Sequence, residues 1–135
     1  MSDSVNNLTV TLNQQDANGV NTLQRTLGAF SYSGLVGEFI RGKLLTSGAE
    51  SQTLPTTNVL QFLLQNTTTG ASGATITITG TKQGGTGAIL AVVQPGSLFV
   101  NWTHGATGSG ANAGYTAISL TASVTGATYE MFLGG

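Results

Sequence analysis

Residues 73–85 read GATITITGTKQGG, a run in which threonine alternates strictly with isoleucine and which glycines close at both ends. Successive side chains of a β-strand point to opposite faces, so this period of two predicts a strand with Ile76 and Ile78 on one face and threonines on the other. Threonine suits a solvent-facing strand position, because it is β-branched and its hydroxyl tolerates water. The stretch therefore predicts a sheet with one apolar face and one hydroxyl-bearing face.

The same period recurs along the chain, from NLTVTLN at residues 7–13 to TYEMFLG at residues 128–134, where Tyr129, Met131 and Leu133 share one face. The run AILAVVQ at residues 88–94 is apolar on both faces, which is typical of a central strand covered from both sides. The core predicted from these alternations comprises Leu8, Val10, Leu12, Leu60, Phe62, Leu64, Ile76, Ile78, Ile89, Ala91, Val93, Leu98, Val100, Ile118, Leu120 and Val124.

Glycine, proline and asparagine mark the turns between these runs. Pro95-Gly96 predicts a type II turn, since proline sets φ at the second position and glycine permits a positive φ at the third. Asn18-Gly19 predicts another turn. Residues 28–45 carry four glycines, which would cost a helix up to about 1 kcal/mol each, so a helix is excluded there.

Two alternatives remain for that glycine-bearing region. It forms either two short strands broken near Ser33-Gly34, or one bent strand with bulges at Gly37 and Gly42. With either alternative, the count comes to about eight short strands and no convincing helix. We therefore expect a single domain spanning residues 1–135, an all-β antiparallel sandwich of the eight-stranded jelly-roll type.

Charged residues make up only 7% of the 135-residue chain, its net charge is −1, and 39% of it is hydrophobic. A chain of this composition is expected to fold, because disorder requires low hydrophobicity and high net charge. The four basic residues form no cluster able to neutralise a run of phosphates, so no nucleic-acid partner is expected. No segment resembles a signal peptide or a membrane span, so we expect synthesis in a cytoplasm and no membrane partner.

The residues that usually carry chemistry are sparse, and we expect no enzymatic activity, no cofactor and no metal. His104 is the single histidine, cysteine is absent, and the five carboxylates are dispersed, so nucleophilic triads, paired acids and metal sites all lack their parts. Trp102 shares the predicted face of Leu98 and Val100, which favours a core position over a sugar-stacking one.

A surface with so few charges lacks the usual protection against association. Apolar residues predicted to be exposed, such as Phe99, Phe132 and Val36, would be unfavourable on a free monomer. The composition therefore favours a building block whose faces and edges are covered by neighbouring subunits.

The threonine-rich strands, the turn QPGSLFVNW at residues 94–102, the absence of cysteine and the last strand YEMFLGG resemble the small jelly-roll decoration, or cement, proteins of tailed bacteriophage heads. This resemblance implies a protein on the outer surface of a virion capsid, made in the host cytoplasm, which binds the major capsid protein, often as a homotrimer at local threefold positions. It implies no catalytic residues. The low charge departs from the electrostatic steering expected of such a protein.

The residues predicted to make capsid or subunit contacts lie in three segments. We expect the N-terminal segment to lie on a neighbouring subunit and the closely spaced basic pair to meet acidic groups of the shell. Glycines in the loop from Trp102 to Tyr115 permit close approach of another chain. The predicted contact residues are Ser4, Val5, Asn7, Arg41, Lys43, Trp102, His104 and Tyr115. The alternative function is a carbohydrate- or receptor-binding module of a phage tail or spike.

Overall fold

The structure, a computed structural model, describes residues 4–34, 37–46, 48–69, 73–102 and 114–135, with the backbone alone described for residues 4–6, 27–34 and 102. These residues form ten strands and no helix, and all their pairings are antiparallel. The strands are β1 (Ser4–Gln15), β2 (Asn21–Gly34), β3 (Gly37–Lys43), β4 (Glu50–Ser51), β5 (Gln61–Asn66), β6 (Ile76–Lys82), β7 (Ala88–Val93), β8 (Leu98–Trp102), β9 (Tyr115–Ala122) and β10 (Thr128–Gly134). The all-β antiparallel prediction is confirmed, with more strands than expected.

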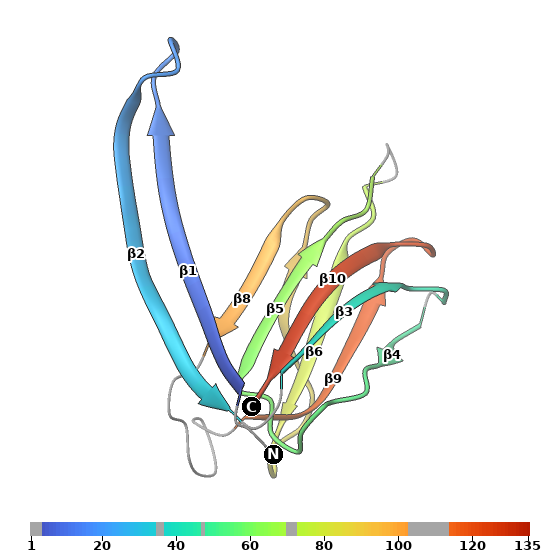
Figure 1. The fold of residues 1–135 in the computed structure, drawn as a ribbon. Helices are drawn as coiled ribbons and strands as arrows, with labels where there is room; N and C mark the ends of the chain where they lie inside the picture. The colour runs from blue at the N-terminus through green and yellow to red at the C-terminus, as the bar shows by residue number, and fades with distance from the viewer. Residues whose placement is uncertain (1–3, 35–36, 47, 70–72, 103–113) are drawn as a thin grey trace.

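Strands β3 to β10 form a sandwich of two four-stranded sheets (Figure 1), ordered β3-β10-β5-β8 and β4-β9-β6-β7. The pairs nest around the connection between β6 and β7: β6 pairs with β7, β5 with β8, β4 with β9 and β3 with β10. Successive pairs alternate between the two sheets. Strands β3 to β10 therefore follow the path of one long antiparallel hairpin that is folded over, so that successive strand pairs lie in opposite sheets.

The core lies between the inner faces of the two sheets. Phe62, Leu64, Met131 and Leu133 come from β5 and β10, and Ile76, Ile78, Ile118 and Leu120 come from β6 and β9; all are buried. The predicted register of β6 is confirmed, because Ile76 and Ile78 are fully buried while Thr77 and Thr79 remain partly accessible. The inward face predicted for Tyr129, Met131 and Leu133 is confirmed as well.

Two strands differ from the prediction because both of their faces are apolar. Strand β7 is an edge strand and not a central one, and the side chain of its Ile89 is 69% exposed. In β8 the inward residue is Phe99, whose ring centroid lies 5.5 Å from that of Phe62, so Leu98 and Val100 face outward. A register displaced by one residue exchanges every inward and outward side chain of a strand.

Six other residues of the predicted core are exposed or only half-buried. Val10 and Leu12 on β1 and Val124 in the β9–β10 loop are exposed. Leu8, Leu60 and Ala91 are half-buried. The alternation of β1 is real, but among the described strands β1 pairs with β2 alone, and Val10 and Leu12 on its apolar face stay exposed.

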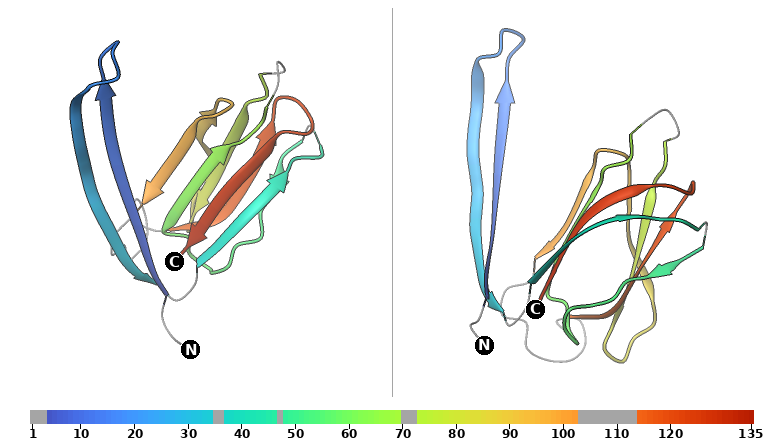
Figure 2. Two further views of the ribbon diagram at one scale, coloured as in Figure 1. Left: turned by 45° about the horizontal axis from the view of Figure 1, so that its top comes forward. Right: turned by 45° about the vertical axis from the view of Figure 1, so that its right-hand side comes forward.

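Strands β1 and β2 form a long two-stranded hairpin, which we call the arm. Figures 1 and 2 show it leading away from the sandwich and approaching it only near its base. The predicted turn at Asn18-Gly19 is present: the Asp16 carboxylate accepts the backbone N–H groups of Asn18 and Val20 at 2.9 and 3.0 Å. Strand β2 ends at Gly34, where one alternative predicted a break between two strands. It is 14 residues long, however, and not short.

The predicted type II turn at Pro95-Gly96 connects the two sheets. The Ser97 N–H donates to the Gln94 carbonyl at 2.9 Å, and Gly96 has a φ of 78°, a conformation that glycine adopts readily. The Gly96 N–H also donates to the backbone carbonyl of Asn66 at 2.7 Å. The turn is thereby fixed to the end of β5.

Asn66 is a buried polar residue at the end of β5. Its side-chain Nδ2 donates to the carbonyls of Ala74 and Val93, both at 2.9 Å, and its Oδ1 accepts the Thr68 N–H at 3.1 Å. The first two bonds reach the start of β6 and the end of β7, so one amide ties both sheets together. A buried polar group that is fully hydrogen-bonded avoids the cost of desolvation.

Replacement of Ile78 by Ala tests the register of the core. Ile78 is fully buried and Ile89, on the neighbouring strand, is exposed, so Ile78→Ala should lower the free energy of unfolding by about 2–5 kcal/mol and Ile89→Ala by at most about 0.5 kcal/mol. Urea unfolding of the two variants at low protein concentration measures the difference. Equal losses would contradict the assigned faces.

Replacement of Asn66 by Asp tests the amide that joins the sheets. The change keeps the shape but places a carboxylate against two carbonyl oxygens, so Asn66→Asp should cost about 3 kcal/mol or more at neutral pH. Asn13→Asp on the exposed arm is the matched control. Thermal unfolding reports the effect, and a loss no larger than that of the control would show that the two bonds contribute little.

Candidate functional site

The outer faces of the two sheets differ in chemistry. On sheet β4-β9-β6-β7 the register aligns Thr77 with Thr121 and Thr79 with Ser119, so hydroxyl groups cover the two central strands, and exposed apolar side chains (Ile89 and Val92) are found on the edge strand β7. On sheet β3-β10-β5-β8 the corresponding positions carry large apolar side chains. The second face is therefore the candidate contact surface.

Four apolar side chains cross this face, one from each strand. Phe39 of β3 pairs with Phe132 of β10, Phe132 with Leu63 of β5, and Leu63 with Val100 of β8. We call these four residues the apolar row. Phe132 and Leu63 are half-buried, whereas Phe39 and Val100 at the two ends are 55% and 37% exposed. Because neighbouring strands are about 4.8 Å apart, the row is about 14 Å long.

The next row on the same face carries charge. Arg41 of β3 lies opposite Glu130 of β10, and Arg41 Nε is 3.1 Å from Glu130 Oε1. The guanidinium carbon of Arg41 also lies 5.7 Å from the centre of the Phe39 ring. The Arg41 side chain is 77% exposed, so this ion pair stabilises the fold little and stays accessible to a partner.

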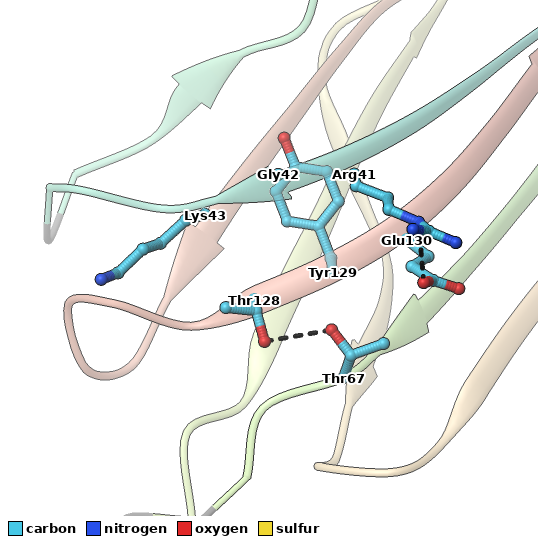
Figure 3. Close-up of a pocket in the computed structure, with 7 residues that line it drawn as sticks. All are labelled: Arg41, Gly42, Lys43, Thr67, Thr128, Tyr129 and Glu130. Carbon is cyan, nitrogen blue, oxygen red and sulfur yellow. Dashed lines mark hydrogen bonds and ion pairs between the residues drawn. The ribbon is translucent and has the colours of Figure 1, made fainter.

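A pocket of about 360 Å³ lies where β3 and β10 meet the loop after β5 (Figure 3). Thr67 Oγ1 donates to Thr128 Oγ1 at 3.0 Å on one side of it, and Arg41 and Lys43 extend in different directions on either side of Tyr129. The lining residues are Arg41, Gly42, Lys43, Thr67, Thr128, Tyr129 and Glu130.

The ring of Tyr129 lies against the backbone of β3 because its partner in the register is Gly42. A Cβ at Gly42 would collide with the ring. Such a cross-strand contact lets an aromatic ring cover a glycine in a sheet. The Tyr129 hydroxyl donates to Gln52 Oε1 at 3.1 Å, which fixes the ring.

Burial raises the pKa of the Tyr129 hydroxyl above its ordinary value, and the negative charge of Glu50 contributes to the same shift. Backbone N–H donation from Thr46, with further bonds from Leu45 and the Thr46 hydroxyl, holds the pKa of Glu50 below its ordinary value. At neutral pH Tyr129 is therefore a neutral donor and Glu50 a carboxylate that closes the β3–β4 loop. The lining of the pocket includes the cationic side chains of Arg41 and Lys43, and its carboxylate, Glu130, is already paired with Arg41.

Of the predicted contact residues, the structure brings Arg41 and Lys43 together at the pocket, where both occupy outward positions of β3. Backbone hydrogen bonds join this end of β3 to the β9–β10 loop, since Leu44 N–H donates to the Ala127 carbonyl at 2.8 Å. Leu45 and Val124 of these two loops are exposed. Cations and apolar side chains therefore occur together at this end of the sandwich.

The other predicted contact residues lie elsewhere. Ser4, Val5 and Asn7 are at the base of the arm, paired with Gly34, Ser33 and Ser31. Tyr115 is only 7% exposed, and its hydroxyl accepts a hydrogen bond from Asn101 Nδ2 at 2.7 Å, so its ring belongs to the core and is not an exposed anchor. Trp102 ends β8 opposite Gln61, and its side chain lies outside the described part, as does the whole of His104.

The arm carries a second apolar surface. Leu8, Val10 and Leu12 alternate along β1, and the register places Leu23 of β2, opposite Gln14, on the same face. We call these four residues the arm face. Leu12 and Leu23 are 48% and 40% exposed. The opposite face carries polar side chains such as Thr9, Thr11, Asn13 and Gln24.

Within the described residues, no group of three or more His, Asp or Glu side chains lies close enough to hold a metal ion. The same part of the chain contains no helix that is long and apolar enough to cross a bilayer. Comparison of the chain with protein-family models, with curated proteins and with solved structures finds no match.

The apolar row was missed because it depends on the register of four strands. Its sequence signal is a strand with apolar residues on both faces, as in FLL at residues 62–64 and MFL at residues 131–133. A strand in a two-layer sandwich has one face in the core, so a second apolar face indicates cover from outside the layer.

Replacement of Gly42 by Ala tests the contact under Tyr129. The added methyl group would displace a buried ring that is also held by Gln52, so Gly42→Ala should lower the free energy of unfolding by about 1–3 kcal/mol. Gly48→Ala, where no atom lies within 4 Å of the added Cβ, is the control and should be nearly neutral. Chemical unfolding measures both, and equal stabilities would contradict the close approach.

Proposed function

We propose that this chain is a structural, non-enzymatic subunit of a virion that binds the outer surface of a capsid as a decoration protein. In this proposal it associates as a homo-oligomer, a trimer, and its partner is the major capsid protein. It is made in the host cytoplasm and functions on the particle surface.

The strand order supports the jelly-roll part of this proposal. A jelly roll has eight strands in two four-stranded sheets, formed by wrapping one long antiparallel hairpin. Strands β3 to β10 pair as four nested pairs divided between two sheets, which is the pairing that such a wrapping produces. In this interpretation the arm precedes the jelly roll as an addition.

The observation that carries the functional proposal is the apolar row. Phe39 and Val100 are exposed at its ends, on a chain of which only 7% is charged. Exposed apolar patches mark interaction sites, and a low charge removes the usual barrier to association. An assembly subunit uses both properties, whereas a free monomer would be prone to aggregate.

The pocket end of the sandwich is the proposed contact with the shell. Arg41 and Lys43 provide positive charge there, and Leu45 and Val124 provide apolar area. Complementary charge accelerates docking and fixes orientation, while the apolar side chains supply area to bury. A mature shell with acidic groups at its capsomer junctions is the matching surface.

The second candidate is a carbohydrate- or receptor-binding module. It is favoured by one observation, the exposed ring of Phe39 beside the guanidinium of Arg41. An aromatic face next to a fixed polar group is a common arrangement in ligand sites. Binding to a glycan array by the isolated protein would distinguish this candidate.

Charge reversal at the pocket tests the capsid proposal. The purified chain is mixed with expanded, empty heads assembled from the major capsid protein of the same genome, and bound protein is measured after sedimentation. Wild type should bind to saturation, and Lys43→Glu should bind about tenfold more weakly at low salt, with the difference shrinking as salt screens the charge.

Lys82→Glu is the control, because it makes the same change in net charge at the end of β6, outside the pocket lining. It should bind like wild type once circular dichroism has shown that it is folded. Folded wild type that fails to bind the heads would reject the capsid proposal. Binding that Lys82→Glu weakens as much as Lys43→Glu would reject the pocket as the contact.

A further inference from the structure

We propose that the arm is an exchange element: its arm face packs on the apolar row of a second copy of this chain. This inference rests on the homo-oligomer in the proposed function and not on the capsid. It assigns the interface to two surfaces, each of which the chain leaves exposed.

The arm needs a partner for its own stability. An isolated two-stranded hairpin is at best marginally stable in water, and independent stability requires more strands or a packed apolar face. The arm strands are 12 and 14 residues long, whereas β5 and β10 are 6 and 7 residues long, so the arm is about twice as long as these central strands of sheet β3-β10-β5-β8. Figure 2 shows that it leads away from that sheet.

The two surfaces match in length. Leu8, Val10 and Leu12 span about 14 Å along β1, since alternate residues of an antiparallel strand are about 6.8 Å apart. The apolar row also spans about 14 Å, but it runs across its strands. An arm laid along the row would therefore cross the strands of the acceptor sheet at nearly a right angle, which is one of the two preferred ways in which sheets pack.

The charges beside the two surfaces are complementary. Arg25 lies opposite Leu12 and so on the arm face, and it is the single cation among residues 4–26. Glu130 lies in the row next to the apolar row, and within the described strands it is the one carboxylate that the register places on that outer face. An arm docked with β2 over this neighbouring row brings Arg25 to Glu130, which would then be shared between Arg25 and its present partner Arg41.

A second copy is the occupant that these observations favour, because the donor surface and the acceptor surface are both present on the same chain. Because they are different surfaces, each copy can both give and receive an arm, either reciprocally in a twofold dimer or head to tail in a heterologous ring. Heterologous contacts form closed rings when the rotation between subunits closes. The trimer of the proposed function is such a ring.

Directed cross-linking tests the exchange, and the absence of native cysteine makes it clean. Leu12→Cys and Val100→Cys are prepared separately, mixed, and treated with a bismaleimide whose reach matches the roughly 10 Å between packed sheets. We expect a covalent product that contains one chain of each variant. Both positions are exposed in the single chain, so neither substitution threatens its fold.

Two matched pairs serve as controls. Thr11→Cys replaces Leu12→Cys and reports from the opposite face of the arm, and Ile89→Cys replaces Val100→Cys and reports from the other sheet. Neither control pair should give the covalent product that contains one chain of each variant. Equal yields in the controls would overturn the inference, as would a product of Leu12→Cys with itself, which would indicate that arm packs on arm.

A chain that carries both Leu12→Cys and Val100→Cys tests whether the arm instead folds back onto the sandwich of the same chain. A cross-link within one chain that persists on dilution would overturn the exchange. Sedimentation velocity gives a second measurement: Leu12→Asp and Leu63→Asp should shift the protein towards monomer, while Thr11→Asp should not. A wild type that is monomeric at high concentration would also overturn the inference.

The cross-linking and sedimentation experiments use the protein without capsids, so the arm exchange and the capsid proposal can be rejected independently of each other. Cross-linking between Leu12→Cys and Val100→Cys without binding to heads would reject the capsid and keep the arm exchange. Saturable binding of wild type to heads without the mixed cross-link would reject the exchange and keep the capsid.

Discussion

The side-chain amide of Asn66 joins the two sheets where the chain crosses from β5 to β6 and from β7 to β8. Its two N–H groups bind carbonyls at the start of β6 and the end of β7, and its backbone holds the turn that leads to β8. The β5–β6 loop, the end of β7 and the β7–β8 turn are therefore all bonded to one buried residue. The pairs β4–β9 and β3–β10 lie outside these inner pairs in the chain, so their alignment depends on the connection that Asn66 makes.

A two-layer sandwich offers one interior, and the apolar residues of this chain exceed what that interior holds. Part of the surplus is ordered into two surfaces, the row across β3, β10, β5 and β8 and the single face of the arm. Other apolar side chains, among them Ile89 and Val92 of β7, are exposed outside these surfaces. The two central strands of the other outer face carry threonine and serine, which contribute hydroxyls without charge. A row that crosses all four strands occurs on sheet β3-β10-β5-β8, and this is the face that we propose for contacts between subunits.

The sequence predicted best those strands in which a single face is apolar. Alternation located β6 correctly, because threonine separates its core positions. It also located the inner face of β10, although Phe132 there stands between the core positions Met131 and Leu133. It failed for β8, where Leu98, Phe99 and Val100 are all apolar and only the packing of Phe99 on Phe62 decides the register. For the arm it identified an amphipathic strand but not the absence of a covering sheet, since periodicity shows which side needs cover and not what supplies it.

The candidate site was predictable to a smaller extent. The spacing of Arg41 and Lys43 places them on one side of a strand, and this follows from the sequence. The pocket between them depends on Tyr129, which a distant segment brings to Gly42, and no local pattern indicates that pairing. Tyr115 shows the converse: its position after a glycine-rich loop suggested exposure, whereas its hydroxyl bonds to Asn101 inside the fold.

The environment of Asn66 also restricts where the chain can be produced. Asn66-Thr67-Thr68 is an acceptor sequence for N-linked glycans, and glycan transfer modifies the same Nδ2 that the folded protein buries. A sugar added during translocation, before β5 pairs, would replace one of the two Nδ2 hydrogens, so the carbonyls of Ala74 and Val93 could no longer both be satisfied at this buried position. Secretion from a eukaryotic cell would thus trap a fraction of the chains unfolded, and a bacterial cytoplasm is the suitable expression host.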